Sequence, residues 1–448
     1  MRFLDLDAPG GDFAANLGSR TLGTPLAVFA RLRRSRRLFV LLAVVGPGLI
    51  TSNADNDAGG IATYAQAGAQ FRFKMLWLLV VVTICLIVVN EMSARMGVVT
   101  GKGLADLIRE RFGVRSTAFA MALLLVANAF TTVAEFAGIA AGMELLGVPK
   151  FVSVPIAAIL IWLLVVRGSY PVVERVLLSI AIVYLSYVVS GFLVHPNWGE
   201  ILRASAVPQV EVSRAYILLS IALIGTTITP WMQFYLQAAI AEKGIPEDQL
   251  AYSRADVIVG SVVTDVIAFF IVVATALTLA GHLSAAQLGN MQAGDYARAL
   301  VPVAGHFAGI LFGIGLVGAS LLAGSVVPLS TAYAVSEAFG FERGVDRGIR
   351  DAPIFFGIFT FLIVVGALAV LVPGVPLVSM ILLSQDVNGL ILPAILVYML
   401  ILVNDRRLMG RFVNNWGANA IAGITVAGLI VLSLLLLTAS IPGSPLAG

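Results

Sequence analysis

Apolar positions along this chain are grouped in long blocks, and polar positions are gathered in short connections between them. The blocks are about 20 residues long, which is the length needed to cross the hydrocarbon core of a bilayer. The pattern predicts an all-α polytopic membrane protein with eleven transmembrane helices. Their expected ranges are 39–66, 75–98, 117–146, 151–167, 173–194, 215–240, 255–281, 305–336, 353–373, 376–402 and 416–440.

Composition supports this class. Hydrophobic residues make up 59% of the 448 residues and charged residues only 12%, whereas a soluble domain carries about 25% charged residues. The single cysteine, Cys85, lies in an apolar run, so a disulfide framework and a thiolate metal cluster are excluded. The start of the chain lacks the pattern of a cleaved signal peptide, and residues 1–37 are expected to form a polar tail.

The basic residues indicate the orientation. Most of the 28 Lys and Arg residues fall in alternate connections, beginning with the N-terminal tail. Because cytoplasmic connections collect such residues, we expect a cytoplasmic N-terminus, an extracellular C-terminus and a place in the cell (plasma) membrane. The arginine cluster just before the first span fits this topogenic role better than a nucleic-acid or lipid-binding patch.

The first span is interrupted between Gly46 and Gly60, in the stretch GPGLITSNADNDAGG. Its two acids, Asp55 and Asp57, each cost about 2.5–3.5 kcal/mol at the middle of a span, so such residues usually face a cavity on an ion or substrate path. The flanking glycines and Pro47 favour a broken helix, which frees backbone carbonyls to coordinate a cation. We therefore expect Asp55 and Asp57 to hold a cation.

The sixth span, LIGTTITPWMQFYLQAA, has a second interruption. Pro230 cannot donate an amide hydrogen bond, and Gly225 with the threonine-rich run at 226–229 weakens the helix before it. Broken helices 1 and 6, five spans apart, predict a 5+5 inverted repeat whose half-helices meet at the midplane. The expected parts of the single transmembrane domain, 38–448, are a first repeat at 38–195, a second at 214–403 and an additional helix at 415–440.

Other polar residues at membrane depth are candidates for the same site. Gln385 and Asp386 add oxygen donors in the tenth span, where we also expect an interruption at Asn388 and Gly389. Gln233 follows the sixth-span break by one turn and is expected either to line the cavity or to bond a neighbouring helix.

Three further acids lie within spans. Glu135 in the third span has two open interpretations, an ion-path or proton-carrying residue or a structural carboxylate. Asp265 and Glu91 are assigned to packing networks or to vestibule charge. The three histidines lie near span ends, so the usual nitrogen ligands of transition metals are missing from the midplane.

The first span resembles the first helix of the NRAMP family of divalent-metal transporters, whose pattern is Gly-Pro-Gly, a short run, Asp-Pro-Gly-Asn and Ala-Thr. The stretches IGTTITPW, TTVAEFAGIAAGMELL and LLSQ resemble the family's sixth, third and tenth helices. This resemblance covers nearly all of the chain. It implies a LeuT-type fold and transport by alternating access.

The chain departs from the family pattern at the ligands. Asp57 keeps the family's aspartate, but Gly60 stands in place of its asparagine and Thr229 in place of its methionine. Thr132 and Trp231 replace an aspartate and a histidine associated with proton movement. Oxygen ligands suit Mg²⁺, Ca²⁺ or Mn²⁺, and Mg²⁺ retains several waters. The pattern resembles the NRAMP-related magnesium transporters of prokaryotes, which implies uptake without protons.

The expected function is import of Mg²⁺, and also of Mn²⁺, as a largely hydrated ion, by a monomer that needs the lipid bilayer but no cofactor and no nucleic acid. The alternative is a proton-coupled carrier of Mn²⁺ or Fe²⁺. An organic-cation or amino-acid symporter is a weaker rival, and a membrane metalloenzyme lacks its motif. The expected metal-site residues are Asp55, Asp57, the Ala54 carbonyl, Thr226, Thr229, Gln233 and Gln385.

Overall fold

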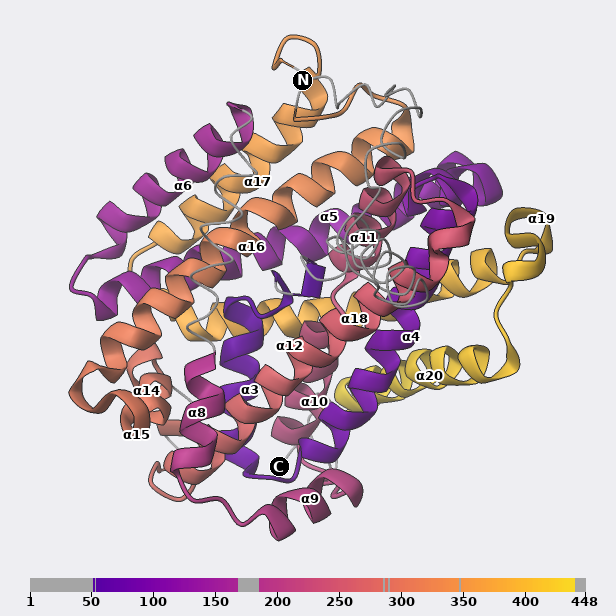
Figure 1. Cartoon of the computed structure of the whole chain (residues 1–448). Helices are drawn as coiled ribbons and strands as arrows, with labels where there is room; N and C mark the ends of the chain where they lie inside the picture. Colours follow the sequence, from indigo (N-terminus) through magenta and orange to yellow (C-terminus); the bar gives the residue numbers. More distant parts are fainter. Residues whose placement is uncertain are drawn as a thin grey trace, which may run out of the picture. The chain divides into compact units, whose positions relative to one another are not determined.

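A computed structural model describes residues 51–52, 54–167, 185–284, 287–288, 291–345 and 348–439, all within one compact unit, Val44–Gly448 (Figure 1). The predicted polar tail, the Gly-Pro-Gly motif and most of the predicted fifth span lie outside the described residues. The described helices are α3 (Ala58–Phe71), α4 (Leu76–Thr100), α5 (Leu104–Leu145), α6 (Lys150–Val166), α8 (Leu185–Leu193), α9 (Trp198–Ala206), α10 (Arg214–Thr227), α11 (Pro230–Lys243), α12 (Leu250–Thr278), α14 (Ala293–Ala297), α15 (Val301–Ala304), α16 (Ala308–Phe339), α17 (Pro353–Leu371), α18 (Leu377–Val403), α19 (Arg406–Met409) and α20 (Trp416–Ala439), with short 3₁₀ turns η2 (Glu247–Gln249), η3 (Arg298–Leu300), η4 (Gly305–Phe307) and η5 (Gly410–Phe412).

The prediction of a helical, polytopic membrane protein is confirmed. Eight helical segments of the described ranges are long and apolar enough to cross a membrane, and α6 is a shorter apolar helix. α5 is longer than its predicted span because it contains two helices that meet at Gly113, where φ is 77°. The part of α5 after Gly113 corresponds to the predicted third span.

Both predicted helix breaks next to the candidate site are confirmed. In the first span, residues 54 and 55 are helical, residues 56 and 57 form a bend, and α3 begins at Ala58. In the sixth span, α10 ends at Thr227 and α11 begins at Pro230. Proline fits the first position of a helix because its missing amide would have no partner there.

The predicted interruption at Asn388 and Gly389 is wrong, because α18 runs without a break from Leu377 to Val403. Gly389 instead allows α18 to cross α10 closely. A Cβ atom there would lie 2.5 Å from the carbonyl oxygen of Ile221. A glycine in a membrane helix can mark a helix break or allow a close helix crossing. The structure of the neighbouring helix is needed to tell the two apart.

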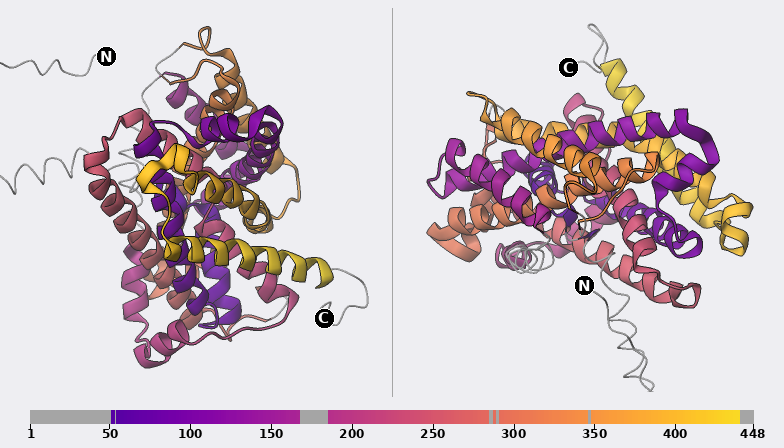
Figure 2. Two further views of the ribbon diagram at one scale, coloured as in Figure 1. Left: turned by 90° about the vertical axis from the view of Figure 1, so that its right-hand side faces the viewer. Right: turned by 90° about the horizontal axis from the view of Figure 1, so that it is seen from above.

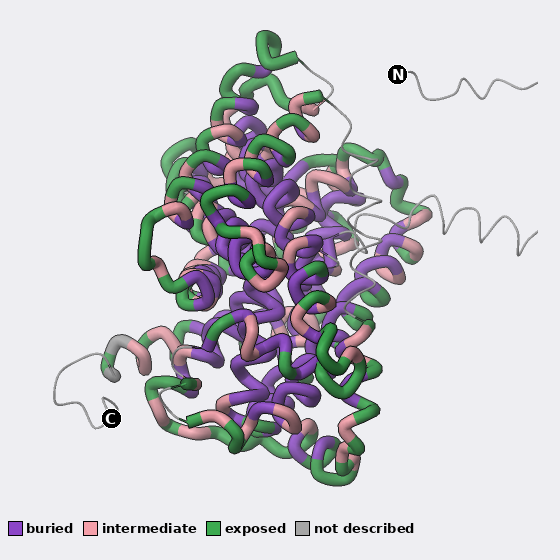
Figure 3. The backbone as a smooth tube through the Cα atoms, turned by 90° about the vertical axis from the view of Figure 1, so that its left-hand side faces the viewer, coloured by how far each residue is buried: buried purple, intermediate pink, exposed green. Residues whose placement is uncertain are grey.

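The described helices pack in two groups. α3 packs on α12 and α10, and α4 packs on α12 and α11, whereas α5 packs on α16, α17 and α6. α18 contacts both groups, because it packs on α5, α10 and α3. Buried residues gather along the interior of these helices and exposed residues at their outer sides and ends (Figure 3).

Small residues allow α5 and α16 to approach at backbone distance. Gly138 and Gly142 are four residues apart and therefore lie on one face of α5, as in the small-xxx-small pattern of membrane helices. A Cβ atom on Gly142 would lie 2.9 Å from the carbonyl oxygen of Gly313 and 2.8 Å from a methyl group of Val317. No side chain larger than hydrogen fits there without moving α16.

Contacts between connections agree with the predicted alternation of sides. Arg111 pairs with Asp405 at 2.8 Å, which joins two connections predicted on the cytoplasmic side. Lys74 pairs with Glu211, also at 2.8 Å, and joins two connections predicted on the outside. The two sets of connections are thus each held together, while the assignment of one side to the cytoplasm stays a prediction.

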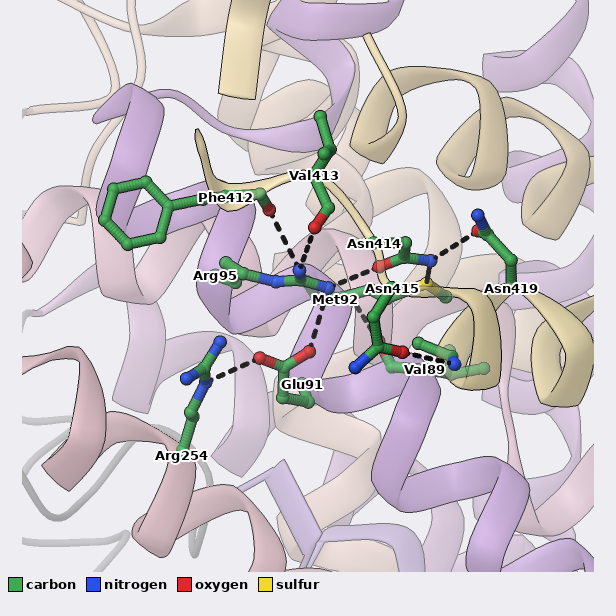
Figure 4. A network of polar contacts seen from close by, with 12 residues as sticks. Val89, Glu91, Met92, Arg95, Arg254, Phe412, Val413, Asn414, Asn415 and Asn419 are labelled. Atoms are coloured by element: carbon green, nitrogen blue, oxygen red, sulfur yellow. Dashed lines mark hydrogen bonds and ion pairs between the residues drawn. The ribbon is translucent and has the colours of Figure 1, made fainter. Parts of the chain in front are cut away.

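The start of α20 is fixed by a buried arginine (Figure 4). Arg95 of α4 donates to the carbonyl oxygens of Phe412 at 2.9 Å and Val413 at 3.3 Å. Its other amino group pairs with Glu91 at 3.0 Å and bonds Asn414. Glu91 also pairs at 2.7 Å with Arg254 of α12, so the packing role predicted for Glu91 is confirmed. The network joins α4, α12 and the connection before α20. The helix α20 itself lies at the edge of the described helices, where it contacts α18, α10 and α4 (Figure 2).

Gly142→Ala is expected to lower the free energy of unfolding by about 1–3 kcal/mol, which is the usual cost of overpacking. The matched control is Gly357→Ala in α17, where an added Cβ meets open space. The apparent melting temperatures of the two variants, purified in the same detergent, should separate. Equal melting temperatures would contradict the close crossing of α5 and α16.

Arg95→Ala is expected to destabilise the protein by about 1–3 kcal/mol, because it leaves two backbone carbonyls without their donor, while Glu91 keeps its ion pair with Arg254. Arg411→Ala removes an ion pair whose arginine side chain is 82% exposed, and it serves as the control. Thermal unfolding should show a large decrease in melting temperature for the first variant and almost none for the second. Similar decreases for both would show that the network is not stabilising.

Candidate metal-ion site

Asp57 forms the N-cap of α3. Its Oδ1 accepts a hydrogen bond from the Gly60 amide at 2.7 Å, which satisfies one of the free amides at the start of the helix. Its Oδ2 has no hydrogen-bond partner among the described residues. One oxygen of this carboxylate therefore holds the helix, and the other does not take part in the cap.

Asp55 joins the two broken spans. Its Oδ1 lies 3.5 Å from Thr229 Oγ1, which is a long hydrogen bond donated by the threonine. Thr229 precedes Pro230 and does not cap α11 with its side chain. Asp55 is only 1% exposed, and its Oδ2 has no partner within the described ranges. The predicted meeting of the two breaks is thus present in the geometry.

A second contact connects the same two spans. The Thr227 hydroxyl donates to the Leu223 carbonyl at 2.8 Å, so the Tyr64 hydroxyl, also 2.8 Å from it, must be the donor in their hydrogen bond. Tyr64 lies on α3, two turns after Asp57. The sequence analysis did not identify this contact, although the spacing places Tyr64 on the same face of α3 as Asp57.

Gln385 of α18 approaches the start of α3 from a third direction. Its amide lies so close to Gly59 that a Cβ atom there would overlap it. The amide orientation is fixed by hydrogen bonds to Ser384 at 2.9 Å and from Asn388 at 3.2 Å, and Asn388 also bonds Thr131 of α5 at 3.0 Å. Gln385 therefore lies beside the first-span break, as expected of a residue that lines the site.

Three other predicted ligands, Thr226, Gln233 and Ala54, are buried near the two breaks. Thr226 is fully buried, and its hydroxyl has no partner among the described residues. Gln233 is fully buried as well, and within the described part of the chain neither polar atom of its amide is hydrogen-bonded to the aspartates or to any other group. Ala54 is buried directly before Asp55. Ligation by these three residues stays a prediction.

Glu135 of α5 contacts the first-span break. Its Oε2 accepts a hydrogen bond from the Ala58 amide at 3.4 Å, and its carboxyl group lies against that of Asp57, with Ser320 of α16 beside it. Glu135 is fully buried. This position places the acid beside the candidate site, and both interpretations, an ion-path residue and a structural carboxylate, stay predictions.

Thr132 and Trp231 stand at the positions that the family pattern links to proton movement, and both side chains are buried. Thr132 donates to the Asn128 carbonyl of its own helix at 2.6 Å and packs against Gly366. Trp231 is fully buried near Tyr235, with ring centroids 6.1 Å apart. Neither side chain can take up or release a proton near neutral pH.

Asp265 of α12, for which a packing network or a vestibule charge was expected, is buried near the site. The residue is 4% exposed, and its charge acts on both Asp55 and Tyr64. The hydroxyl of Thr83, which lies beside Asp265, donates to the Leu79 carbonyl at 2.8 Å. The sequence around Asp265 contains no helix break, so no local signal separated it from a packing residue.

This arrangement suits a cation that is held mainly by oxygen atoms. Within the described ranges, no three His, Cys, Asp or Glu side chains converge as a direct metal-binding cluster. Two carboxylates with free oxygens, hydroxyls and an amide remain around the break. A cation bound by one or two carboxylates that retains part of its water shell matches these donors.

The chain is similar to proteins of one family. A family model described as "Natural resistance-associated macrophage protein-like" (Nramp) matches residues 48–439. The divalent metal cation transporter MntH of Aeromonas hydrophila is 30% identical over 428 residues, with 89% of this chain and 96% of the relative covered. The MntH protein of Verminephrobacter eiseniae is 28% identical over 448 residues, with 95% and 97% covered.

Solved structures show the same fold. The manganese transporter of Eremococcus coleocola matches with a TM-score of 0.73 at 19% identity, covering 95% of this chain and 91% of that one. A nucleobase-cation-symport-1 family transporter matches with a TM-score of 0.52 at 12% identity, covering 90% and 94%. The LeuT-type fold is therefore confirmed, and the family match over residues 48–439 shows that the chain belongs to the Nramp family.

Proposed function

We propose that this protein carries a divalent metal ion across the membrane by alternating access, with Asp55 and Asp57 as the anionic centre of its site. One observation carries the proposal. Among the described residues, no Lys, Arg or His forms an ion pair with either buried carboxylate, Asp55 keeps one oxygen without a hydrogen bond, and the neighbour of Asp57 is a further acid, Glu135. A buried negative charge needs a compensating cation, and a transported cation supplies it.

Mn²⁺ is the cargo that the relatives support, because the similar proteins are named as divalent metal cation and manganese transporters. The donors of this chain also accept Mn²⁺, since carboxylate, hydroxyl and amide oxygens suit hard divalent ions. Thr229 provides oxygen where the family pattern has a thioether. Fe²⁺ and softer ions are therefore expected to be poorer cargo here.

Mg²⁺ is the second candidate, and the departures from the family pattern favour it. The loss of two bulkier ligands, at Gly60 and Thr229, leaves space for water on the ion, which Mg²⁺ gives up reluctantly. Thr132 and Trp231 cannot move protons. The membrane potential alone can drive uptake without protons, because a divalent ion gains about 4.6 kcal/mol on entering a cell that is negative by 100 mV.

The proposed setting is the plasma membrane, with the N-terminus in the cytoplasm and the C-terminus outside. The alternation of basic connections supports this orientation, and each of the two ion pairs described above joins connections predicted on the same side. We propose that the protein acts as a monomer, since both halves of the site come from one chain.

The experiment that tests the function is metal uptake into sealed vesicles that contain the purified protein, a metal-sensitive dye and a pH dye. Asp57→Asn should reduce uptake of the cargo at least tenfold, since a charge-assisted contact contributes about 1.5–3 kcal/mol. Asparagine still caps a helix, so α3 keeps its start. Glu144→Gln, at an exposed position of α5, is the charge-matched control.

The two dyes separate the outcomes. Entry of Mn²⁺ with acidification of the vesicle interior supports the proton-coupled carrier. Entry of Mg²⁺ at constant pH, increasing with an inside-negative potential, supports uncoupled magnesium uptake. Unchanged uptake by the Asp57→Asn variant would contradict the assigned site, and no uptake of any divalent ion by the wild-type chain would contradict transport.

Thr229→Met is expected to shift selectivity toward soft ions. A thioether favours Cd²⁺ over Mg²⁺, and we expect the uptake ratio of Cd²⁺ to Mg²⁺ to increase about tenfold, equivalent to about 1.4 kcal/mol. The change removes no helix cap, because the Thr229 side chain makes none. Ile228→Met adds the same group at the neighbouring position and should leave the ratio unchanged. An equal shift in both variants would remove Thr229 from the site.

A further inference from the structure

An apolar groove of about 360 Å³ lies between α4, α10 and α20, away from the candidate metal site. Its walls include Trp77 and Cys85 from α4, Tyr216 and Ile224 from α10, and Gly428 from α20. Trp77 and Cys85 are eight residues apart, as are Tyr216 and Ile224, so the groove follows each helix for about 12 Å. This length fits an extended hydrocarbon chain.

The hydroxyl groups in the groove walls are already used. Ser220 donates to the Tyr216 carbonyl of its own helix at 2.7 Å, and Thr425 donates to the Ile421 carbonyl at 2.9 Å. The rest of the lining is almost entirely hydrocarbon. A polar ligand would lose its hydrogen bonds to water without replacement, so the groove suits an apolar occupant.

One end of the groove has the residues of a membrane interface. Trp77 donates its indole N–H to the Tyr216 hydroxyl at 3.3 Å, and that hydroxyl donates to the Gln209 carbonyl at 2.8 Å. Tryptophan and tyrosine favour the level of the lipid headgroups. Lys74 and Arg214 lie within three residues of this aromatic pair along the chain. Lys74 is paired with Glu211 at 2.8 Å, and Arg214 leaves this group of three charges with a net positive charge.

The side of the groove that α20 forms is open toward the surrounding bilayer. α20 contacts its neighbours with a small part of its surface, and Ile424 and Val431, which both line the groove, are 67% and 54% exposed. An added Cβ on Gly428 would meet no atom within 4 Å, so this glycine leaves the wall open. A chain from the surrounding bilayer can therefore enter from the side.

We propose that this groove is a lipid-binding site that holds one acyl chain of an anionic phospholipid, with its phosphate at the Lys74 and Arg214 end. The occupant then packs directly against α10. Ile224 is two residues before Thr226, so the chain contacts the half-helix that leads into the candidate metal site. The proposal does not depend on which metal is transported.

The only cysteine of the chain makes the test direct, because Cys85 lines the groove. The full-length protein is purified without lipid in detergent, and the rate of Cys85 modification by N-ethylmaleimide is measured with and without phosphatidylglycerol. At a lipid concentration ten times its Kd, occupancy should slow modification about tenfold. Native mass spectrometry should show one retained phospholipid per chain.

Gly428→Leu fills the groove and should abolish both the retained lipid and the effect of lipid on the modification rate. Gly423→Leu adds the same side chain to the same helix, also where a Cβ meets open space, but Gly423 does not line the groove. This control should behave like the wild type. Thermal unfolding of both variants checks that each is folded.

Three results would overturn the proposal. The first is modification of the wild-type Cys85 at the same rate with and without phospholipid. The second is equal lipid retention by the Gly428→Leu and Gly423→Leu variants. The third is protection that increases with protein concentration in the absence of lipid, together with a doubled particle mass, because the groove would then be an interface with a second copy of this chain.

Discussion

Two buried carboxylates, for which the described part of the chain contains no counter-ion, impose the main constraint on this structure. Asp55 and Asp57 can stay inside a membrane protein only if backbone amides, hydroxyls or a bound cation stabilise their charge. An unbroken helix offers no free amides in its middle. The break before Ala58 provides them, and Asp57 uses the Gly60 amide at 2.7 Å. The helix break and the anionic centre are therefore one feature.

The contacts between the surrounding helices are of two kinds, rigid and adjustable. α5 and α16 cross at Gly142 and Gly313 with backbone against backbone, which leaves no side chain to rearrange. Contacts around the breaks instead use single hydrogen bonds, such as the long one between Thr229 and Asp55. A hydrogen bond of this kind contributes about 1 kcal/mol, so the half-helices can exchange partners while the pair formed by α5 and α16 stays intact.

The sequence predicted the parts of the site that have a local cause. The acids inside an apolar run predict the break before Ala58, and Pro230 after a weak helical stretch predicts the break before α11. Both breaks are present. Gly389 was misjudged because its role depends on another helix: it serves a crossing with α10. The place of Asp265 likewise depends on how α12 packs on α3, and its two expected roles, in packing or as a vestibule charge, stay open. Contacts between distant segments leave no trace in a single stretch of sequence.

The hydrogen bond between Tyr64 and Thr227 has a mechanical consequence. It joins the middle of α3 to the last residue of α10, one half-helix from each broken span. When one half-helix tilts, the phenol either carries the other with it or the bond breaks. The Tyr64 hydroxyl, together with the contact between Asp55 and Thr229, thus couples the tilting of one half-helix to that of the other.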